Sequence, residues 1–428
     1  MNVALRYGKE WLTGDLPEDW RVDVLAPKGA PALENPAAAI AAALDNPLGG
    51  GPIAERARGK RSAVIVVSDI TRPVPNSLVL PLLLDRLQAG GIAPSAVTIL
   101  VATGLHRPPT TGEVLEIVGS EALSTGVNVE AHHAKERSEH VHRGETARGV
   151  PVWIDRRYVD ADVRITLGLV EPHLMAGFSG GPKSLCPGIA GEETIMGFHG
   201  PRLLAHPRAM SGATEGNPVL EESWAVATMA GLPDLCVNFV LSLERAVVGV
   251  HAGEIAAVHE AAIAQARASL GVTLDAPADI VVTSAGGYPL DLTFYQGTKG
   301  IVAASDIVRP GGGIIVVERN AEGVGSPEIC DLLATCGDPA LWQPDLEADA
   351  ASIVDEWQLQ ELAKAAYKGR IVNVCPDAPP SLRGAIPVPT VDSIEEAVAL
   401  LAKEGIPGAG PVRAAVMPDG PYTLAEVA

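Results

Sequence analysis

The stretch from residue 171 to residue 199 reads EPHLMAGFSGGPKSLCPGIAGEETIMGFH. It follows the run VRITLGLV at residues 163–170, which is apolar and rich in β-branched residues and therefore predicts a buried strand. Within the stretch, His173, Lys183 and His199 can each act as a base, a nucleophile or a metal ligand. Reactive side chains therefore begin where the predicted strand ends.

Small residues surround Lys183, as they do in loops that cradle phosphate groups, and glycine lets a backbone approach a bound group closely. The spacing is not that of a Walker loop, so an ordinary P-loop is rejected. Residues 191–198 predict a short helix with His199 at its end. Taken singly, these features are also typical of a tight turn, a loop histidine and a solvated lysine, and their combination favours a site. The small residues before the lysine are Ser179, Gly180 and Gly181.

Length and composition limit the class of protein. The chain has 428 residues, 47% of them hydrophobic, which predicts a globular protein of two or three domains. Its formal charge of −20 argues against a nucleic-acid partner, which requires clustered Lys and Arg. No apolar run approaches the ~20 residues that cross a bilayer, and the start of the chain does not resemble a signal peptide. Five cysteines without a C-x-x-C pair suit reduced thiols, so we expect a cytoplasmic protein with no membrane partner.

Two further strands are each followed by polar side chains. Residues 63–67 precede the loop SDITRPVPN and a predicted helix, and residues 97–101 precede the loop ATGLHRPPT. If these strands and residues 163–170 form a parallel sheet, their loops meet at its carboxyl edge, where open α/β sheets bind ligands. We therefore expect one crevice to be lined by Asp69, Arg72, His106, His173 and Lys183.

The remainder of the chain predicts a second α/β unit. Residues 271–278 resemble a linker, and residues 279–283 predict a strand that opens the segment SAGGYPLDLTFYQGTKG. The predicted fold is α/β, with two domains of largely parallel sheets and a cleft between them. We expect an N-terminal domain at 1–272, against which the tail at 410–428 packs, and a C-terminal domain at 279–409. The polar candidates of the second unit are Tyr295, Gln296 and Lys299.

Four histidines lie in a polar segment that also contains Glu130, Lys135, Glu136, Arg137 and Glu139. This composition predicts a solvated connection between elements, and a metal site there is the less favoured interpretation. The four are His132, His133, His140 and His142.

Five separated motifs together resemble the nickel-dependent lactate racemases and their 2-hydroxyacid racemase and epimerase relatives. They occur in order along nearly the whole chain: SDITRP at 68–73, ATGLHRP at 102–108, EPHLMAGFSGGPKSLCPGI at 171–189, His199, and SAGGYP with YQGTKG at 284–300. The resemblance implies nickel held in a nickel-pincer nucleotide, pyridinium-3-thioamide-5-thiocarboxylic acid mononucleotide. It also implies partner proteins that build this cofactor, and a small 2-hydroxyacid as substrate.

The resemblance also implies a role for each matching residue. His199 would be the nickel ligand, Lys183 the lysine that can form a thioamide with the cofactor, and His106 and His173 the paired acid/base groups. The positions expected to contact the cofactor are Asp69, Ser179, Gly180 and Gly181, and those expected to contact the substrate are Arg72, Tyr295, Gln296 and Lys299.

Two alternatives remain open at this point. The protein could bind a cofactor or nucleotide without catalysis, although binding alone needs no acid/base pair. It could also be a metal hydrolase that uses the same histidines, which requires a metal with an open position for water. The segment YPLDLTFYQ departs from the lysine-bearing version of the family at Leu290, which bears on the choice of 2-hydroxyacid.

Overall fold

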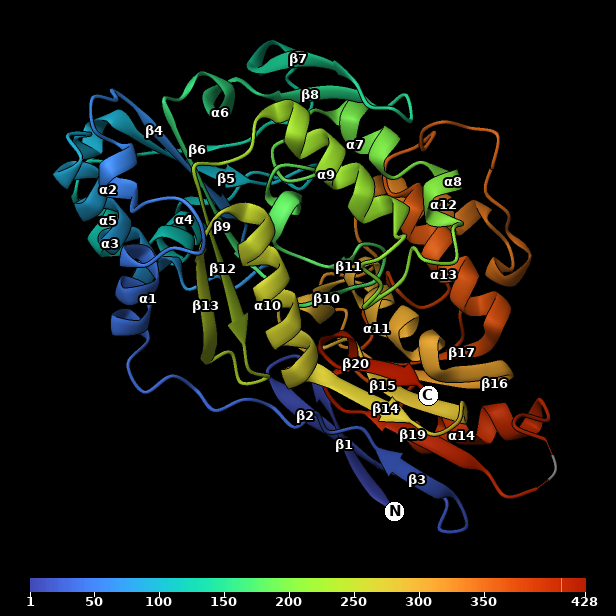
Figure 1. The fold of residues 1–428 in the computed structure, drawn as a ribbon. Helices are drawn as coiled ribbons and strands as arrows, with labels where there is room; N and C mark the ends of the chain where they lie inside the picture. Colours follow the sequence, from blue (N-terminus) through green and yellow to red (C-terminus); the bar gives the residue numbers. More distant parts are fainter. Residues whose placement is uncertain (409) are drawn as a thin grey trace.

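The structure is a computed structural model that describes residues 1–408 and 410–428. Two six-stranded sheets form its centre, each with helices or a hairpin on both faces (Figure 1). All strand pairs within these two sheets are parallel except the pair β12 and β13. The predicted α/β class with largely parallel sheets is confirmed.

The first sheet is built from apolar, β-branched runs, which suit strands buried on both faces. Its spatial order is β13-β12-β9-β4-β5-β6. The strands are β4 (Ala63–Ser68), β5 (Val97–Ala102), β6 (Asn128–Ala131), β9 (Val163–Leu169), β12 (Leu235–Leu241) and β13 (Val247–Gly253).

Alternate side chains of the first sheet enter two different cores. Ile65 and Val67 of β4 pack against the helices on one face, whereas Val64 and Val66 face the opposite core. The first group of helices is α1 (Pro36–Asp45), α2 (Ile53–Arg56), α3 (Asn76–Ala89), α4 (Thr111–Val118) and α5 (Ser120–Ser124). The second core is formed with α7 (Glu192–Phe198), α8 (Pro201–Leu204) and α9 (Pro218–Ala230), while α10 (Ile255–Leu270) packs on β12 and β13.

The second sheet has the order β18-β17-β16-β15-β19-β3. Its strands are β3 (Arg21–Val24), β15 (Ala278–Ser284), β16 (Val308–Val317), β17 (Gly369–Val374), β18 (Thr390–Val391) and β19 (Arg413–Met417). One face carries α11 (Phe294–Ile307), α12 (Pro327–Thr335) and α13 (Glu356–Lys368). The other face carries α14 (Ile394–Lys403) and the hairpin of β1 (Asn2–Tyr7) and β2 (Glu10–Asp15).

Strand pairing distributes the chain differently from the predicted domain ranges. Residues 1–24 were expected in the N-terminal domain. Their strand β3 instead pairs with β19 in the second sheet. The expected linker contains β14 (Gly271–Leu274), which pairs with β20 (Leu424–Val427) near the end of the chain. These pairings join segments roughly 150 to 400 positions apart, which local patterns do not encode. We call residues 36–270 the first lobe, and residues 1–24 with 271–428 the second lobe.

The histidine-rich segment is not the solvated connection that its composition predicts. It forms β7 (His140–Glu145), paired with β8 (Pro151–Asp155), and the side chains of His132 and His140 are buried. The ring of His132 lies between the carboxylate of Asp155 and the carbonyl of Ala190, each 2.9 Å from one ring nitrogen. The segment is therefore partly packed into the first lobe, because the ring of His132 finds partners inside the fold, whereas residues 135–138 are exposed.

No helix among the described residues is both long and apolar enough to span a bilayer. All five cysteines in this part of the chain are free thiols, as the sequence predicted.

Candidate active site

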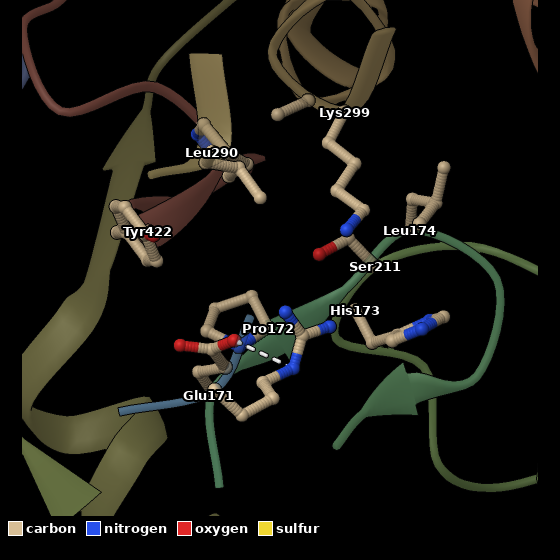
Figure 2. A pocket seen from close by; sticks show the side chains of 11 residues that line it. Glu171, Pro172, His173, Leu174, Ser211, Leu290, Lys299 and Tyr422 are labelled. Carbon is tan, nitrogen blue, oxygen red and sulfur yellow. Dashed lines mark ion pairs between the residues drawn. The ribbon is translucent and has the colours of Figure 1, made fainter. Parts of the chain in front are cut away.

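The candidate active site lies between the carboxyl ends of the two sheets. In the first sheet β4 has β5 on one side and β9 on the other, and in the second β15 likewise has β16 and β19. Such a reversal of strand order creates the crevice in which open α/β sheets bind ligands. A cavity with an empty volume of about 410 Å³, partly open to solvent, lies there (Figure 2). It is lined by Arg72, Glu171 and His173 from the first lobe and by Leu290, Lys299 and Tyr422 from the second.

Asp69 and His106 form a hydrogen-bonded pair across the loops that follow β4 and β5. The Nδ1–H of His106 donates to Oδ2 of Asp69 at 2.6 Å, and Oδ1 of Asp69 accepts from the hydroxyl of Thr71 at 2.6 Å. Burial raises the pKa of Asp69, but the His106 ring and the Thr71 hydroxyl outweigh it, so the pKa lies below its ordinary value. The ionised carboxylate thus fixes the ring and leaves Nε2 of His106 unprotonated in the neutral tautomer.

Local sequence explains why the His106 loop holds its position. Thr110 caps α4 in a reciprocal capping box with Glu113, and Arg107 pairs with the same carboxylate at 2.7 Å. Arg107, the residue directly after His106, therefore ties this loop to the first turn of α4.

His173 has the opposite hydrogen-bond pattern. Its Nδ1 accepts from the backbone N–H groups of Met175 and Ala176, each at 3.2 Å, so the neutral ring carries its proton on Nε2. Burial, followed by the charges of Lys183 and Arg72, lowers the pKa of His173 well below its ordinary value. In this arrangement His173 is a neutral ring that can donate a hydrogen bond from Nε2.

Two cations supply the positive charge of the cavity. Nε of Arg72 lies 3.3 Å from Oε1 of Glu171, and a dashed line in Figure 2 marks this ion pair. The ammonium group of Lys299 donates to the side-chain oxygen of Gln296 one turn earlier on α11. Burial, followed by the charge of Arg72, lowers the pKa of Lys299 to about 7. Arg72 and Lys299 can together hold one carboxylate, provided that it competes with Glu171 for the guanidinium group.

Lys183 lies in a buried turn that the preceding glycines make possible. Gly180 and Gly181 have φ values of 73° and 51°, and a Cβ on Gly181 would lie 2.5 Å from the ring of His259. The hydroxyl of Ser179 donates to the carbonyl of Leu169, so it holds the turn against β9. Burial lowers the pKa of Lys183 to about 8, which raises the fraction of nucleophilic free amine near neutral pH.

His199 is held in place through one of its two ring nitrogens. As predicted from the sequence, it directly follows the helix α7. Its Nδ1–H donates to the carbonyl of Ile195 at 2.9 Å, and no hydrogen-bond partner of Nε2 occurs within the described part of the chain. Metal-binding histidines commonly donate their second N–H in this way. Burial, followed by the charge of Lys183, lowers the pKa of His199 to about 3, so the ring is the neutral form that binds a metal.

A tryptophan of the second lobe covers His199. The rings of His199 and Trp357 stack at 4.4 Å and 24°, and the indole N–H of Trp357 donates to the hydroxyl of Tyr295 at 3.2 Å. Gln360 anchors the same helix to the first lobe by donating to the carbonyl of Pro201 at 2.9 Å. The hydroxyl of Tyr295 therefore holds the tryptophan of this stack, and Tyr295 is not among the residues that line the cavity with Lys299.

Metal-binding side chains do not cluster in the described part of the chain. Within residues 1–408 and 410–428, no three side chains of His, Cys, Asp or Glu lie close enough to hold one ion. A metal at His199 therefore needs most of its ligands from a bound group. The isolated imidazole with a free Nε2 and the nearby buried lysine fit a cofactor that brings its own metal-binding atoms.

Sequence reasoning assigned no role to three residues of the site. Glu171 directly follows the predicted strand, and this position was a usable signal. Tyr422 and Trp357 reach the site only through strand order and helix docking, for which the sequence has no local signal.

Comparison with known proteins identifies the family. The family model described as the lactate racemase N-terminal domain matches residues 7–212, and that described as the lactate racemase C-terminal domain matches residues 273–422. The chain belongs to the lactate racemase family. It is 33% identical over 385 residues to the lactate racemase of Lactiplantibacillus plantarum, with 88% of each chain covered. It is 32% identical over 378 residues to that of Thermoanaerobacterium thermosaccharolyticum, with 87% of this chain and 88% of the relative covered.

Solved structures show the same family fold. The lactate racemase apoprotein from Thermoanaerobacterium thermosaccharolyticum superposes with a TM-score of 0.88 at 29% identity, covering 99% of this chain and 100% of that chain. A protein from Thermotoga maritima shares the fold alone, with a TM-score of 0.66 at 16% identity over 92% of this chain and 98% of that chain.

Proposed function

We propose that the protein is a racemase that inverts C2 of a 2-hydroxyacid, the class to which lactate belongs, with a nickel-pincer nucleotide as cofactor. The observation that supports the proposal is the cavity that His173 lines together with two cations, Arg72 and Lys299, where the loop of Arg72 also carries Asp69, the hydrogen-bond partner of His106. Membership of the lactate racemase family supports the same reaction. A protein that only binds or stores a cofactor has no need of two histidines held in opposite tautomers.

Substrate binding follows from the charges of the cavity. Arg72 provides a planar fork for the carboxylate, and Lys299 adds a second cation. Both are needed in a protein with a formal charge of −20, because the surrounding field repels an anion. The substrate carboxylate displaces Glu171 from Arg72. The C2 hydroxyl then lies near the two histidines.

Proton transfer is assigned to the histidines by their tautomers. Nε2 of His106 accepts the hydroxyl proton of one enantiomer, and the carboxylate of Asp69 stabilises the resulting imidazolium. The imidazolium of His106 returns this proton to the oxygen of the inverted substrate, so no proton is gained or lost, and the neutral ring of His173 donates a hydrogen bond from Nε2 to the substrate oxygen. The 2-ketoacid between these two steps is planar at C2, so its rotation presents the opposite face.

The cofactor is needed because the C2–H bond lies beside a carboxylate, whose charge makes direct proton removal costly. When bound, the nickel-pincer nucleotide supplies a hydride acceptor. In this chain Nε2 of His199 would ligate the nickel, Lys183 would attach to or contact the nucleotide, and the turn at Gly180 and Gly181 would accommodate its phosphate. Proteins that assemble and deliver the cofactor would be its partners, and the five free thiols fit a cytoplasmic location.

The first experiment measures nickel per chain and racemisation together. The protein is produced in a host that makes the pincer cofactor, beside the variant His199→Ala and a working enzyme of this family from the same host. We expect about one nickel per chain and racemisation of at least one 2-hydroxyacid in the parent, and little of either in the variant. Absence of nickel from the parent, with nickel in the control enzyme, would refute the proposal.

A further inference from the structure

The cavity between the lobes has two walls of different chemistry. Arg72, His173 and Lys299 supply the cationic and proton-transfer side. Leu290 and Tyr422 lie on the opposite side of the cavity from His173 (Figure 2). Ala303, Pro421 and Leu174 extend the apolar lining.

Leu290 is the only residue of its segment that offers a side chain to this wall. It is 4% exposed and begins the short 3-10 helix Leu290–Leu292. The neighbouring Asp291 is committed elsewhere, because its carboxylate accepts from the backbone N–H of Gly8 at 2.6 Å and of Arg319 at 3.3 Å. The segment therefore contributes an apolar wall and no charge.

Helix α11 changes character along the face that lines the cavity. Lys299 is the cationic residue of this face, and Ala303 lies four residues further along the helix on the same face. The short side chain of Ala303 fills less of the cavity than a larger residue at this position would. Cation and apolar wall are thus about one helical turn apart, roughly 5.4 Å along the axis.

This arrangement determines where the third substituent of the substrate goes. On the proposed function, the carboxylate binds Arg72 and Lys299, and the hydroxyl lies near the histidines. The substituent that remains on C2 then points to the wall of Leu290, Ala303 and Tyr422. Leu290 and Ala303 offer no cation or hydrogen-bond partner to a second carboxylate or a row of hydroxyls, which would lose their water and find only the hydroxyls of Tyr422 and Ser211.

We propose that the substrates are 2-hydroxy monocarboxylic acids with an aliphatic side chain of two to four carbons, in preference to lactate, dicarboxylic acids and sugar acids. This inference rests on the proposed function and adds its substrate class. Each methylene buried on the apolar wall raises kcat/KM by about fourfold. The methyl group of lactate covers the least of that wall.

The test compares single enantiomers on the nickel-loaded enzyme. The acids are lactate, 2-hydroxybutyrate, 2-hydroxypentanoate, 2-hydroxyisocaproate, phenyllactate and malate, with chiral chromatography as the readout. We expect kcat/KM to rise about fourfold per methylene from lactate to 2-hydroxypentanoate, and malate to lie below lactate. Highest activity with lactate, malate or phenyllactate would overturn this inference alone, since racemisation itself would stand. Racemisation of none of the six by nickel-loaded protein would overturn the proposed function and this inference with it.

Two variants test the wall itself. Ala303→Leu fills the apolar side, so the ratio of kcat/KM for 2-hydroxypentanoate to that for lactate should fall at least tenfold. Leu290→Lys places a cation there and should raise the ratio for malate to lactate, with Leu115→Lys on the exposed helix α4 as control. Nickel content and thermal unfolding report whether each variant is folded. Folded, nickel-loaded variants with unchanged ratios would exclude this wall as the side-chain site.

Discussion

His106 and His173 follow strands of the same sheet but differ in what holds them, and of the two only His173 lines the cavity. The ring of His106 is 45% exposed and donates from Nδ1 to a carboxylate, whereas His173 is more deeply buried and accepts two backbone N–H groups at Nδ1. Cations surround His173, and an anion supports His106. In the neutral state, therefore, His106 offers a lone pair at Nε2 and His173 offers a proton.

The difference teaches that two histidines on facing loops need not be interchangeable. The carboxylate beside His106 prepares this ring to take up and return a proton, whereas the backbone N–H groups at Nδ1 of His173 keep it neutral, as a donor of a hydrogen bond. The predictions below test whether this division holds.

The largest effect is expected from His106→Gln. Loss of a positioned general base lowers kcat/KM by about 100-fold to 10,000-fold. Because enantiomers have equal free energies, kcat/KM must fall equally in both directions. The effect of the change on each enantiomer is therefore measured separately. The quantity is the amount of 2-ketoacid released when a single turnover of the pure enantiomer is quenched with acid. His206→Gln, at an exposed position, is the control, and a loss below threefold in His106→Gln would contradict the assignment.

Asp69→Asn should cost about 100-fold in kcat, because an amide holds the ring but no longer stabilises its charged form. The amide can also donate to Nδ1, which moves the proton of neutral His106 to Nε2. Nitrogen NMR of histidine-labelled protein reads this change directly, with the His173 signal unchanged at the Nε2–H tautomer. An unaltered His106 tautomer together with full activity would show that Asp69 does not position this ring.

The pH dependence of substrate binding should follow Lys299. Its lowered pKa, about 7, means that the ammonium form is present below pH 7 and is lost as pH rises through that value. Binding of an anionic acid to the free enzyme should weaken above pH 7, by up to about tenfold per pH unit where Lys299 dominates. Lys299→Arg stays charged, so its KM should be flat from pH 7 to pH 9. The same rise in KM in this variant would assign the titration to another group.

The smallest effect is expected from Glu171→Gln. The change removes the anion that competes for Arg72, so KM should fall about threefold to tenfold with little change in kcat, as for a partly exposed ion pair. Glu244→Gln, in an exposed turn, is the control. A higher KM would mean that Glu171 orients the guanidinium group and does not compete with the substrate.

The sequence predicted the parts of the site that follow buried strands. The apolar runs before Asp69, His106 and His173 are strands of one sheet, and their loops lie at its carboxyl edge as the parallel pattern requires. The division of roles between the histidines was not predictable, since it depends on which atom faces each ring nitrogen.

The parts that sequence could not predict depend on distant segments. Trp357 stacks on His199 only because α13 docks on α8. His132 is buried because the carbonyl of Ala190 lies within hydrogen-bond distance of its ring, which the composition of the segment does not indicate. Strands β3 and β14 have ordinary local sequences, and their partners lie at the other end of the chain. Periodicity identifies a strand but does not select its neighbour.

The position of β19 between β15 and β3 sets the order in which a growing chain can complete this protein. The first lobe is one continuous segment, so all its strands have been synthesised by residue 270. Strand β3 is synthesised early, but its neighbour Arg413–Met417 is nearly the last segment to emerge. Strand β3 therefore stays unpaired until almost the whole chain has been synthesised. Tyr422 is added to the chain later still. The cavity between the lobes is therefore complete only when nearly the whole chain has been synthesised.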